Sequence, residues 1–313
     1  MRWFQVAALA LLLAASFVPQ PPIAGRPPAT AHRIPLASAG DGHDTVPAYV
    51  DGEGPYPFIL DTGADQSAVY PWFVGRASLP KITGKDQDLS GQTGSSRVSL
   101  YALRSLSLAG VAARGLDAYG LPARRDQGRE AGVLGNDLMD RAIVAFDYPC
   151  RAVELRPRAA GAAALTGPGH APAMAGIDKG TTLLTLPVRI NGVEGIAILD
   201  TGSRWTRLTP GFAKAAGIDT ASAAFHDAEP FYGTSGHPVT PRTGPIGRLT
   251  IGGQSLSGVT AQVVALPVLT QDFGDRPAML LGADILGRFR FVYDHAGRRV
   301  WFLPSRCRGG AGA

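Results

Sequence analysis

Short apolar segments recur along the chain and are bounded by Gly, Pro or Asn. Four clear examples are TLLTLPVRI from Thr182, GIAILD from Gly195, FRFVYD from Phe289 and RRVWFLP from Arg298. Apolar or alternating segments of this length, between turn residues, are typical of β-strands. The dipeptide Asn191-Gly192 favours a two-residue hairpin turn between two such segments. The pattern therefore predicts an all-β fold of short strands and tight turns.

The sequence also contains an internal repeat. FILDTGADQSAV begins at Phe58, and a similar stretch, AILDTGSRWTRL, begins at Ala197. Further along, VLGNDLMDRAIVAFDY from Val133 matches LLGADILGRFRFVYDH from Leu280, and from there the halves align without a gap to a proline. Two copies of one unit predict two similar lobes related by a pseudo-twofold axis.

One short helix is expected in each half, directly after the apolar-apolar-Gly sequence. The two candidates are NDLMDRA at 136–142 and ADILGRF at 283–289. Asn136 and Asp284 lie near the starts of these segments and are residue types that cap helices. The 40 Gly and 25 Pro residues fit a turn-rich protein better than a helical bundle, so the predicted fold class stays all-β.

The length and the repeat together set the expected domain organisation. A chain of 313 residues suits two domains of modest size, each with its own core. We expect a signal peptide and N-terminal segment at 1–31, a first lobe at 32–158, a linker at 159–176 and a second lobe at 177–313. The linker is assigned from its Ala, Gly and Pro content.

The N-terminus resembles an export signal. Arg2 precedes an apolar run from Val6 to Val18, and small residues offer cleavage positions after Ser16 or Ala31. The run falls short of the roughly 20 residues that span a bilayer comfortably. We therefore expect an exported protein, periplasmic or secreted. The alternative is an uncleaved anchor, and only then would the protein be attached to a membrane.

Charge and metal-ligand patterns exclude several classes of function. The net charge is +5, but the basic residues are scattered arginines without interleaved aromatic residues, so nucleic-acid binding is not expected. The six histidines form no pair at metal-ligand spacing. No metal and no cofactor is implied.

Cys150 and Cys307 are the only cysteines in the sequence. In an oxidising compartment they can form one disulfide, while two buried free thiols are an equally ordinary arrangement. The sequence leaves both alternatives open.

ILDTGADQSAV resembles the catalytic loop of the retropepsin-like aspartic proteases, and VLGNDLM and LLGADIL resemble the second signature of that family. The resemblance extends over about 48–157 and 183–304. It implies the two-lobed acid-protease fold, with β-barrel-like lobes and an active cleft between them. It also implies that each lobe contributes one aspartate, Asp61 or Asp200, and that the chain works as a monomer containing an intramolecular pseudo-dimer.

The chemistry gives a reason for two aspartates. A water can attack a peptide bond without a covalent intermediate if one carboxylate accepts its proton while a protonated carboxyl group donates to the carbonyl oxygen. Two carboxyl groups about 3 Å apart share one proton, because both cannot ionise. Each unit supplies only one acid, so Asp61 and Asp200 are expected to meet across the pseudo-dyad as the catalytic pair.

The neighbours of each aspartate have expected supporting roles. Gly63 and Gly202 would turn the chain tightly and aim N–H groups at the carboxylates. The resemblance implies that Thr62 and Thr201 hydrogen-bond across the dyad. Within the four-residue turns DTGA and DTGS, Ala64 and Ser203 are the one chemical difference. A Ser203 hydroxyl on the Asp200 carboxylate would leave the negative charge on Asp200 and the shared proton on Asp61.

Two glycine-rich loops are candidates for flaps that cover a bound peptide, by their position in the family. One contains Gly91, Gln92, Thr93 and Gly94, and the other contains Tyr232, Gly233 and Thr234. Such sequences are also ordinary hairpin turns. The chain departs from the family at Arg204, which occupies the place of an acid, and we expect it to pair with Asp284.

These observations predict an aspartic endopeptidase that cuts extended peptide or protein substrates. The alternative is a catalytically inactive protein on the same fold that binds a peptide as an added strand. A third possibility is a structural protein in which the duplicated turns are a relic. The separation of the Asp61 and Asp200 carboxyl groups distinguishes the enzyme from the binding protein.

Overall fold

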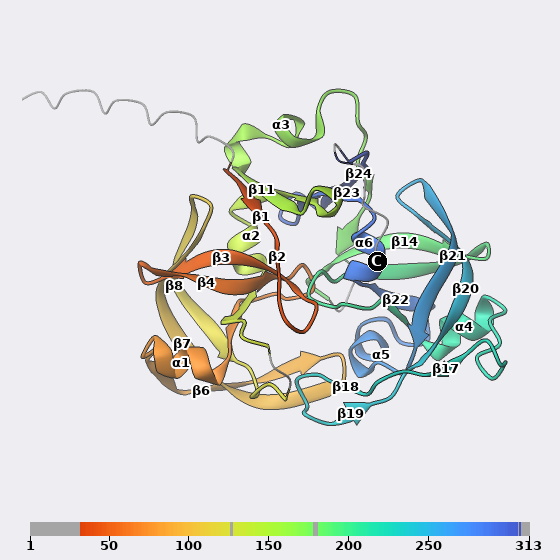
Figure 1. The fold of residues 1–313 in the computed structure, drawn as a ribbon, viewed down its shortest axis with the longest axis horizontal. Helices are drawn as coiled ribbons and strands as arrows, with labels where there is room; N and C mark the ends of the chain where they lie inside the picture. The colour runs from red at the N-terminus through yellow and green to blue at the C-terminus, as the bar shows by residue number, and fades with distance from the viewer. Residues whose placement is uncertain (1–31, 126–127, 178–180, 306, 308–313) are drawn as a thin grey trace, which may run out of the picture.

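The computed structural model describes residues 32–125, 128–177, 181–305 and 307. The expected signal peptide at 1–31 lies outside the described residues. Two β-rich lobes lie side by side, with a further sheet shared between them (Figure 1). The two-lobed, all-β acid-protease fold expected from the sequence is confirmed.

The first lobe is an eight-stranded sheet in the order β2-β3-β4-β9-β5-β8-β7-β6, and an additional pairing of β3 with β7 curls it on itself. Its strands are β2 (Ala37–Ser38), β3 (Asp44–Val50), β4 (Glu53–Leu60), β5 (Ala68–Val69), β6 (Lys81–Gly91), β7 (Gly94–Leu108), β8 (Val111–Gly120) and β9 (Gly132–Leu134).

The second lobe repeats this topology strand for strand, in the order β13-β14-β15-β22-β16-β21-β20-β17, with β14 also paired to β20. Its strands are β13 (Gly176–Ile177), β14 (Leu184–Ile190), β15 (Val193–Leu199), β16 (Arg207–Leu208), β17 (His226–Asp227), β20 (Arg242–Ile251), β21 (Gln254–Val263) and β22 (Ala278–Leu281). A small separate hairpin consists of β18 (Phe231–Tyr232) and β19 (Pro238–Val239). Asn191 and Gly192 form the two-residue turn between β14 and β15, as predicted.

The third sheet joins the lobes in the order β1-β11-β10-β23-β24-β12. Its strands are β1 (His32–Pro35), β10 (Ala142–Asp147), β11 (Ala152–Pro157), β12 (Ala173–Met174), β23 (Arg290–Asp294) and β24 (Arg299–Leu303). β10 and β23 pair antiparallel at its centre, where Ala145 faces Val292. Ala145 lies ten residues after Gly135 and Val292 ten after Gly282, so each of these two positions pairs with its own repeat equivalent. The pseudo-twofold axis therefore passes through this pair.

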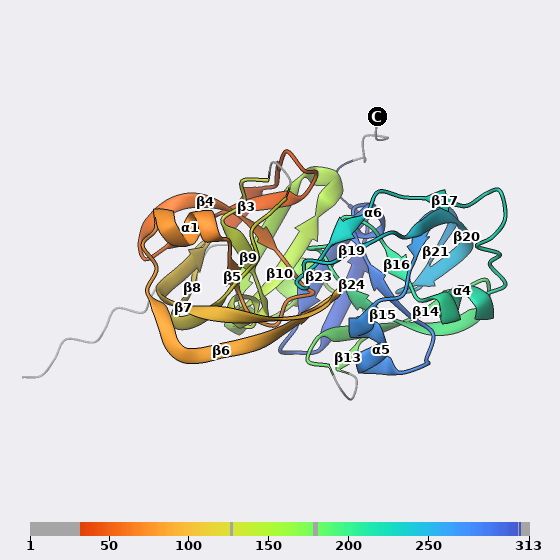
Figure 2. The ribbon, with the colours of Figure 1, turned by 90° about the horizontal axis from the view of Figure 1, so that it is seen from below.

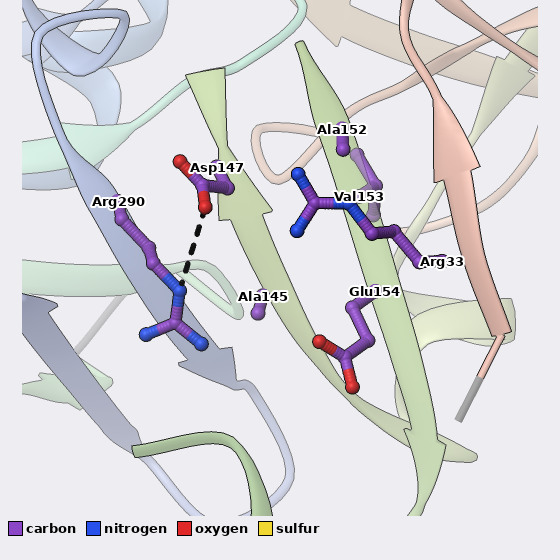
Figure 3. A pocket seen from close by; sticks show the side chains of 7 residues that line it. All are labelled: Arg33, Ala145, Asp147, Ala152, Val153, Glu154 and Arg290. Carbon is purple, nitrogen blue, oxygen red and sulfur yellow. Dashed lines mark ion pairs between the residues drawn. The ribbon is translucent and has the colours of Figure 1, made fainter. Parts of the chain in front are cut away.

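Buried ionic groups accompany the apolar contacts of the shared sheet. Figure 3 shows Arg290 and Asp147 pointing toward one another from β23 and β10, with 3.8 Å between Nε and Oδ2. Asp294 is fully buried at the end of β23 and ion-pairs with Arg158 and Arg299. Arg158 comes from the end of the first lobe, so this second group also links the lobes.

Eight short helices lie among the described residues. They are α1 (Pro71–Arg76), α2 (Asn136–Met139), η1 (Tyr148–Cys150), η2 (Arg158–Ala160), α3 (Ala163–Thr166), α4 (Pro210–Ala215), α5 (Pro267–Phe273) and α6 (Ala283–Leu286). Among them, none is long and apolar enough to span a membrane.

The two helices expected after the apolar-apolar-Gly sequences are α2 and α6. Their predicted N-caps are wrong, because Gly135 and Gly282 occupy the N-cap positions. Asp284 lies inside the first turn of α6, where its side chain accepts from the Ile285 N–H. The stretch expected as a linker, 159–176, also carries α3 and β12, and β12 extends the shared sheet by pairing with β24.

Cys150 and Cys307 are joined by a disulfide, with their Cα atoms 5.2 Å apart. Cys150 follows β10 in the first lobe, whereas Cys307 follows β24 at the end of the second-lobe repeat. The bond therefore fastens the two lobes to each other beside the shared sheet.

Candidate active site

Asp61 and Asp200 follow the ends of β4 and β15, two equivalent apolar strands. Each strand pairs in parallel with a second apolar strand, Leu60 with Leu134 and Leu199 with Leu281. The backbone N–H of Asp61 donates to the Leu134 carbonyl at 2.9 Å, and that of Asp200 donates to the Leu281 carbonyl at 3.0 Å. The buried strands therefore hold both aspartates at fixed positions where the lobes meet.

Two threonines lock the aspartate loops together across the pseudo-dyad. The Thr62 hydroxyl donates to the Leu199 carbonyl at 2.8 Å and accepts from the Thr201 N–H at 3.1 Å. The Thr201 hydroxyl donates to the Leu60 carbonyl at 2.6 Å and accepts from the Thr62 N–H at 3.0 Å. These are the crossed hydrogen bonds that the family resemblance implies.

The glycine after each threonine lets the loops approach closely. A Cβ at Gly63 would lie 2.8 Å from Cγ of Asp200, and a Cβ at Gly202 would lie 2.7 Å from Oδ1 of Asp61. Both N–H groups point to one carboxyl group, because Gly63 and Gly202 donate to Oδ1 of Asp61 at 2.8 and 3.2 Å. Any side chain at either glycine would push the two aspartates apart.

The two carboxyl groups lie beside each other at the pseudo-dyad, because the Gly202 N–H next to Asp200 donates to Asp61 at 3.2 Å while the backbone of Gly63 lies against the Asp200 carboxyl group. Removal from water, followed by the negative charge of Asp200, raises the pKa of Asp61 to about 8, although the two glycine N–H groups act against this. Removal from water also raises the pKa of Asp200, but the Arg207 guanidinium, the Ser203 N–H and the Gln92 amide oppose the rise. A full positive charge outweighs backbone dipoles, so the shared proton belongs on Asp61.

The expected placement of the proton is therefore supported, but the predicted cause is wrong. The Ser203 hydroxyl donates to the Trp205 carbonyl at 3.0 Å and accepts from Arg207 at 2.9 Å, rather than binding the Asp200 carboxylate. Ser203, unlike Ala64, has a hydroxyl group that accepts a hydrogen bond from an arginine of its own lobe, Arg207.

A second pair of matched contacts was not anticipated from the sequence. In the first lobe the Ser67 hydroxyl donates to Asp137 at 2.7 Å and accepts from the Gly135 N–H at 3.1 Å. In the second lobe the Thr206 hydroxyl donates to Asp284 at 2.7 Å and accepts from the Gly282 N–H at 3.0 Å. The repeat places a Ser or Thr at 67 and 206 and an Asp at 137 and 284, and these matching positions could have predicted the contacts. These contacts tie each aspartate loop to the helix that follows it.

The expected ion pair between Arg204 and Asp284 is wrong. Asp284 is occupied by Thr206 and by the N–H of Ile285, whereas Arg204 reaches the carbonyl oxygen of Asp41 in the other lobe. At the equivalent first-lobe position, Asp65 accepts from the Thr182 hydroxyl of the second lobe. Each of these residues therefore contacts the opposite lobe, because the loops lie at the interface.

The two candidate flap loops meet each other over the site. The first is the two-residue turn at Gln92 and Thr93 between β6 and β7, and the second is the loop between β18 and β19. In Figure 2 the long β6–β7 hairpin runs from the first lobe across to the second. The tips are joined by hydrogen bonds from Ser96 to the Thr234 carbonyl, from Thr234 to the Gly94 carbonyl and from Ser235 to the Thr93 carbonyl, at 2.8 to 2.9 Å.

Glycines make this close contact possible. A Cβ at Gly91 would lie 2.5 Å from the Thr234 hydroxyl, and one at Gly233 would lie 2.6 Å from the Thr93 hydroxyl. Tyr232 is half-exposed beside them, with the Arg125 guanidinium 4.5 Å from its ring centre. The loops thus form one closed cover contributed by both lobes.

The side chain of Gln92 projects from this cover onto the carboxyl pair. Its Nε2 donates to Oδ2 of Asp200 at 2.9 Å, and its Oε1 accepts from Arg207 at 2.6 Å. Gln92 therefore occupies space directly above Asp200.

One group of side chains near the cleft has metal-ligand chemistry. Ligand atoms of Asp41, His43 and Glu130 lie within 4.8 Å of one another. The guanidinium of Arg124 ion-pairs with both Asp41 and Glu130 and already supplies the positive charge there. These residues therefore fit an internal ion cluster better than a cation site.

A family model described as aspartyl protease matches residues 46–138 and 186–285, one stretch in each lobe. The two stretches make up well over half of the sequence. The chain belongs to the aspartyl protease family. The resemblance to the retropepsin-like type is thereby confirmed. In this aspartyl protease the matched ranges include Asp61, Asp200, both threonines and both candidate flaps. No curated protein matches the sequence.

Proposed function

We propose that the protein is an aspartic endopeptidase and that Asp61 and Asp200 are its catalytic pair. The observation that supports this most directly is the placement of the two carboxyl groups, one from each lobe, beside each other by the crossed threonine hydrogen bonds and by the Gly202 N–H that donates to Asp61. A pair that shares one proton has both a base and an acid available at the same pH. An inactive binding protein has no need of such a costly pairing of two acids.

In the proposed reaction, a water lies between the two carboxyl groups and the scissile carbonyl carbon. The ionised carboxylate accepts a proton from this water, and its oxygen attacks the carbon while the protonated carboxyl group donates to the carbonyl oxygen. The C–N bond of the resulting tetrahedral diol then breaks as the nitrogen takes up a proton from the pair and one hydroxyl of the diol returns its proton to the pair. The products are one carboxyl group and one amine, and the pair again holds a single proton.

The cover formed by the flap loops defines how the substrate enters. Gln92 lies on Asp200 in the closed cover, so a peptide has to displace its side chain. The cover then closes over an extended peptide and excludes water. We further propose that the enzyme works as a monomer on peptide or protein substrates and is exported to the periplasm or the medium, as its N-terminal sequence indicates.

The test is peptide hydrolysis by the wild-type protein and by Asp61→Asn and Asp200→Asn. Each variant should lose at least about 1000-fold in kcat/KM, because one carboxyl group cannot act as both base and acid. Asp88→Asn makes the same chemical change on an exposed strand position and should leave the rate unchanged. Wild-type protein that binds a peptide library but cleaves none of it between pH 3 and 8 would favour the peptide-binding alternative.

A further inference from the structure

Arg207 is a buried cation next to the carboxyl pair. It is 6% exposed at the start of β16, seven residues after Asp200. Its Nε donates to Gln262 at 2.8 Å, and one terminal nitrogen donates to both Ser203 and Gln92. Its guanidinium carbon also lies 3.8 Å from the ring centre of Phe231, on the β18–β19 hairpin. Arg207 thus contacts the aspartate loop and both parts of the cover.

Within the described part of the chain, Arg207 forms no ion pair with any carboxylate. A buried charge without a paired opposite charge is costly, because nothing offsets the loss of its hydration. Burial lowers the pKa of the Arg207 guanidinium to about 10. Among the acidic groups around it, Asp200 opposes this lowering most strongly. Arg207 therefore stays positive at the pH where proteases work, with Asp200 as its main counter-charge.

The equivalent position of the first lobe carries no cation. Ala68 lies seven residues after Asp61 and is the repeat equivalent of Arg207. It is buried on β5 and pairs with Tyr119, where Arg207 pairs with Gln262. Equivalent strands therefore position the two aspartates, but among the described residues only Asp200 has a buried positive charge near it.

We propose that Arg207 is a positioning residue that keeps the negative charge of the pair on Asp200 and couples this charge to closure of the Gln92 loop. The inference rests on the proposed function and assigns the roles within it. Asp200 is the base that accepts the proton of the water, and Asp61 is the acid that donates to the carbonyl oxygen.

The carboxamide of Gln92 connects the two parts of this inference. It accepts from Arg207 and donates to Asp200, so it satisfies both charges when the cover is closed. When a substrate displaces Gln92, the bound water and the substrate take its place on Asp200. Arg207 keeps its bonds to Ser203 and Gln262 and still acts on the carboxylate.

The other charges around Asp200 and Arg207 do not oppose this assignment. Asp61 faces Asp200 directly, and its own field comes mainly from Asp200. Arg204 and Asp284 also act on Arg207, and Asp284 is further influenced by Arg288. The remaining groups in contact, namely Gln92, Gln262 and Phe231, carry no charge.

The first test is a titration that needs no activity. The carboxyl carbons of aspartate are labelled with ¹³C in the wild-type protein, and the signals of Asp61 and Asp200 are assigned with the two Asn variants. We expect the Asp200 signal to report the first proton loss of the pair and the Asp61 signal the second. Prior ionisation of Asp61, or equal titration of both signals, would overturn the inference.

The second test uses Arg207→Met, Arg207→Lys and the control Lys214→Met, which removes an exposed cation from α4. Loss of the cation destabilises ionised Asp200, so Arg207→Met should move the pH profile of kcat/KM upward by about one to three units. Arg207→Lys should keep most of the wild-type position, and Lys214→Met all of it. An unchanged profile in Arg207→Met, or an equal shift in Arg207→Lys, would contradict the role of the charge.

The two tests separate the failure of this inference from that of the proposed function. A wild-type protein without peptidase activity would contradict the proposed function, while the ¹³C titration would still show which aspartate ionises first. If Arg207→Met does not fold, as judged by circular dichroism, the wild-type titration alone decides the inference.

Discussion

The two lobes carry the same aspartate loop on the same strands, yet they differ in what surrounds each carboxyl group. The two loop threonines, Thr62 and Thr201, and the hydroxyl residue that follows in each loop, Ser67 or Thr206, make matching contacts in both lobes. The differences lie at Ala64 against Ser203, Asp65 against Arg204 and Ala68 against Arg207.

The shared residues are those that contact each other across the pseudo-dyad or hold the loop to its own lobe. The residues that differ lie beside one carboxyl group only, or reach out to the opposite lobe. A duplicated unit can thus keep a symmetric framework while its two acids acquire separate roles. The shared contacts and the local charge differences can be tested separately, the first by stability and the second by pH dependence.

The largest effect on stability is expected at the scaffold level, from Thr62→Val and Thr201→Val. Thr62→Val leaves the Leu199 carbonyl and the Thr201 N–H without their partners, and Thr201→Val does the same to the Leu60 carbonyl and the Thr62 N–H. Each orphaned buried group costs about 1–3 kcal/mol. Urea unfolding should show similar losses for the two variants.

Thr260→Val on the exposed face of β21 is the matched control and should be close to neutral. If one of the two threonine variants loses much more stability than the other, the crossed hydrogen bonds of Thr62 and Thr201 do not contribute equally.

The next largest effect concerns the dependence of stability on pH. Asp61 has a folded pKa of about 8, well above about 3.9 in an unfolded chain, so the folded state holds its proton more tightly. This stabilisation is complete below about pH 4 and is lost as the pH rises toward 8. Asp61→Asn removes the titration. Its melting temperature relative to wild type should therefore be several degrees more favourable at pH 7.5 than at pH 4.5.

The exposed substitution Asp88→Asn should show no such pH dependence. A melting-temperature difference for Asp61→Asn that stays constant between the two pH values would mean that Asp61 ionises normally in the folded protein.

A smaller effect is expected from exchanging Ala64 and Ser203. Ser203→Ala removes one bond to Arg207 and one to the Trp205 carbonyl, and we expect a loss of about 1 kcal/mol. Its pH profile of kcat/KM should move upward by less than that of Arg207→Met, since the cation remains. Ala64→Ser should leave the profile in place. A downward shift in Ala64→Ser would restore the direct role of a hydroxyl at this position.

The smallest effect is expected at Arg204. Its contact with the Asp41 carbonyl is exposed, and such contacts contribute about 0–1 kcal/mol. A double-mutant cycle of Arg204→Ala and Asp284→Asn should show coupling below about 0.5 kcal/mol, because these side chains have different partners. Stronger coupling would reinstate the ion pair that the structure does not contain.

The two-lobed all-β fold and the equivalence of Asp61 and Asp200 were predictable because the repeat makes equivalent positions visible. Each Asp-Thr-Gly follows an apolar triplet, and a second apolar segment recurs at the equivalent place of each repeat, before Gly135 and before Gly282. Two acids at equivalent positions of a twofold unit then meet at the axis. The pairing of Ala145 with Val292 at the centre of the shared sheet shows the same principle.

Contacts between positions that are not equivalent could not be predicted in this way. Gln92 and Arg207 are 115 residues apart and have no counterparts of the same type in the other lobe. Asn136 was expected as a helix cap, whereas its side chain accepts from Tyr293 of the second lobe at 3.0 Å. In both cases the partner is supplied by the opposite lobe, so local sequence carries no signal for it.

The disulfide between Cys150 and Cys307 spans 157 residues of sequence and closes them into one covalent ring. The ring contains the stretch 159–176 and nearly the whole second lobe. A single backbone cut anywhere inside it would open the ring without releasing a fragment. The nicked molecule would migrate as one species on a non-reducing gel and as two after reduction. A protein exposed to proteolysis, including its own, would thereby keep both aspartates in one particle.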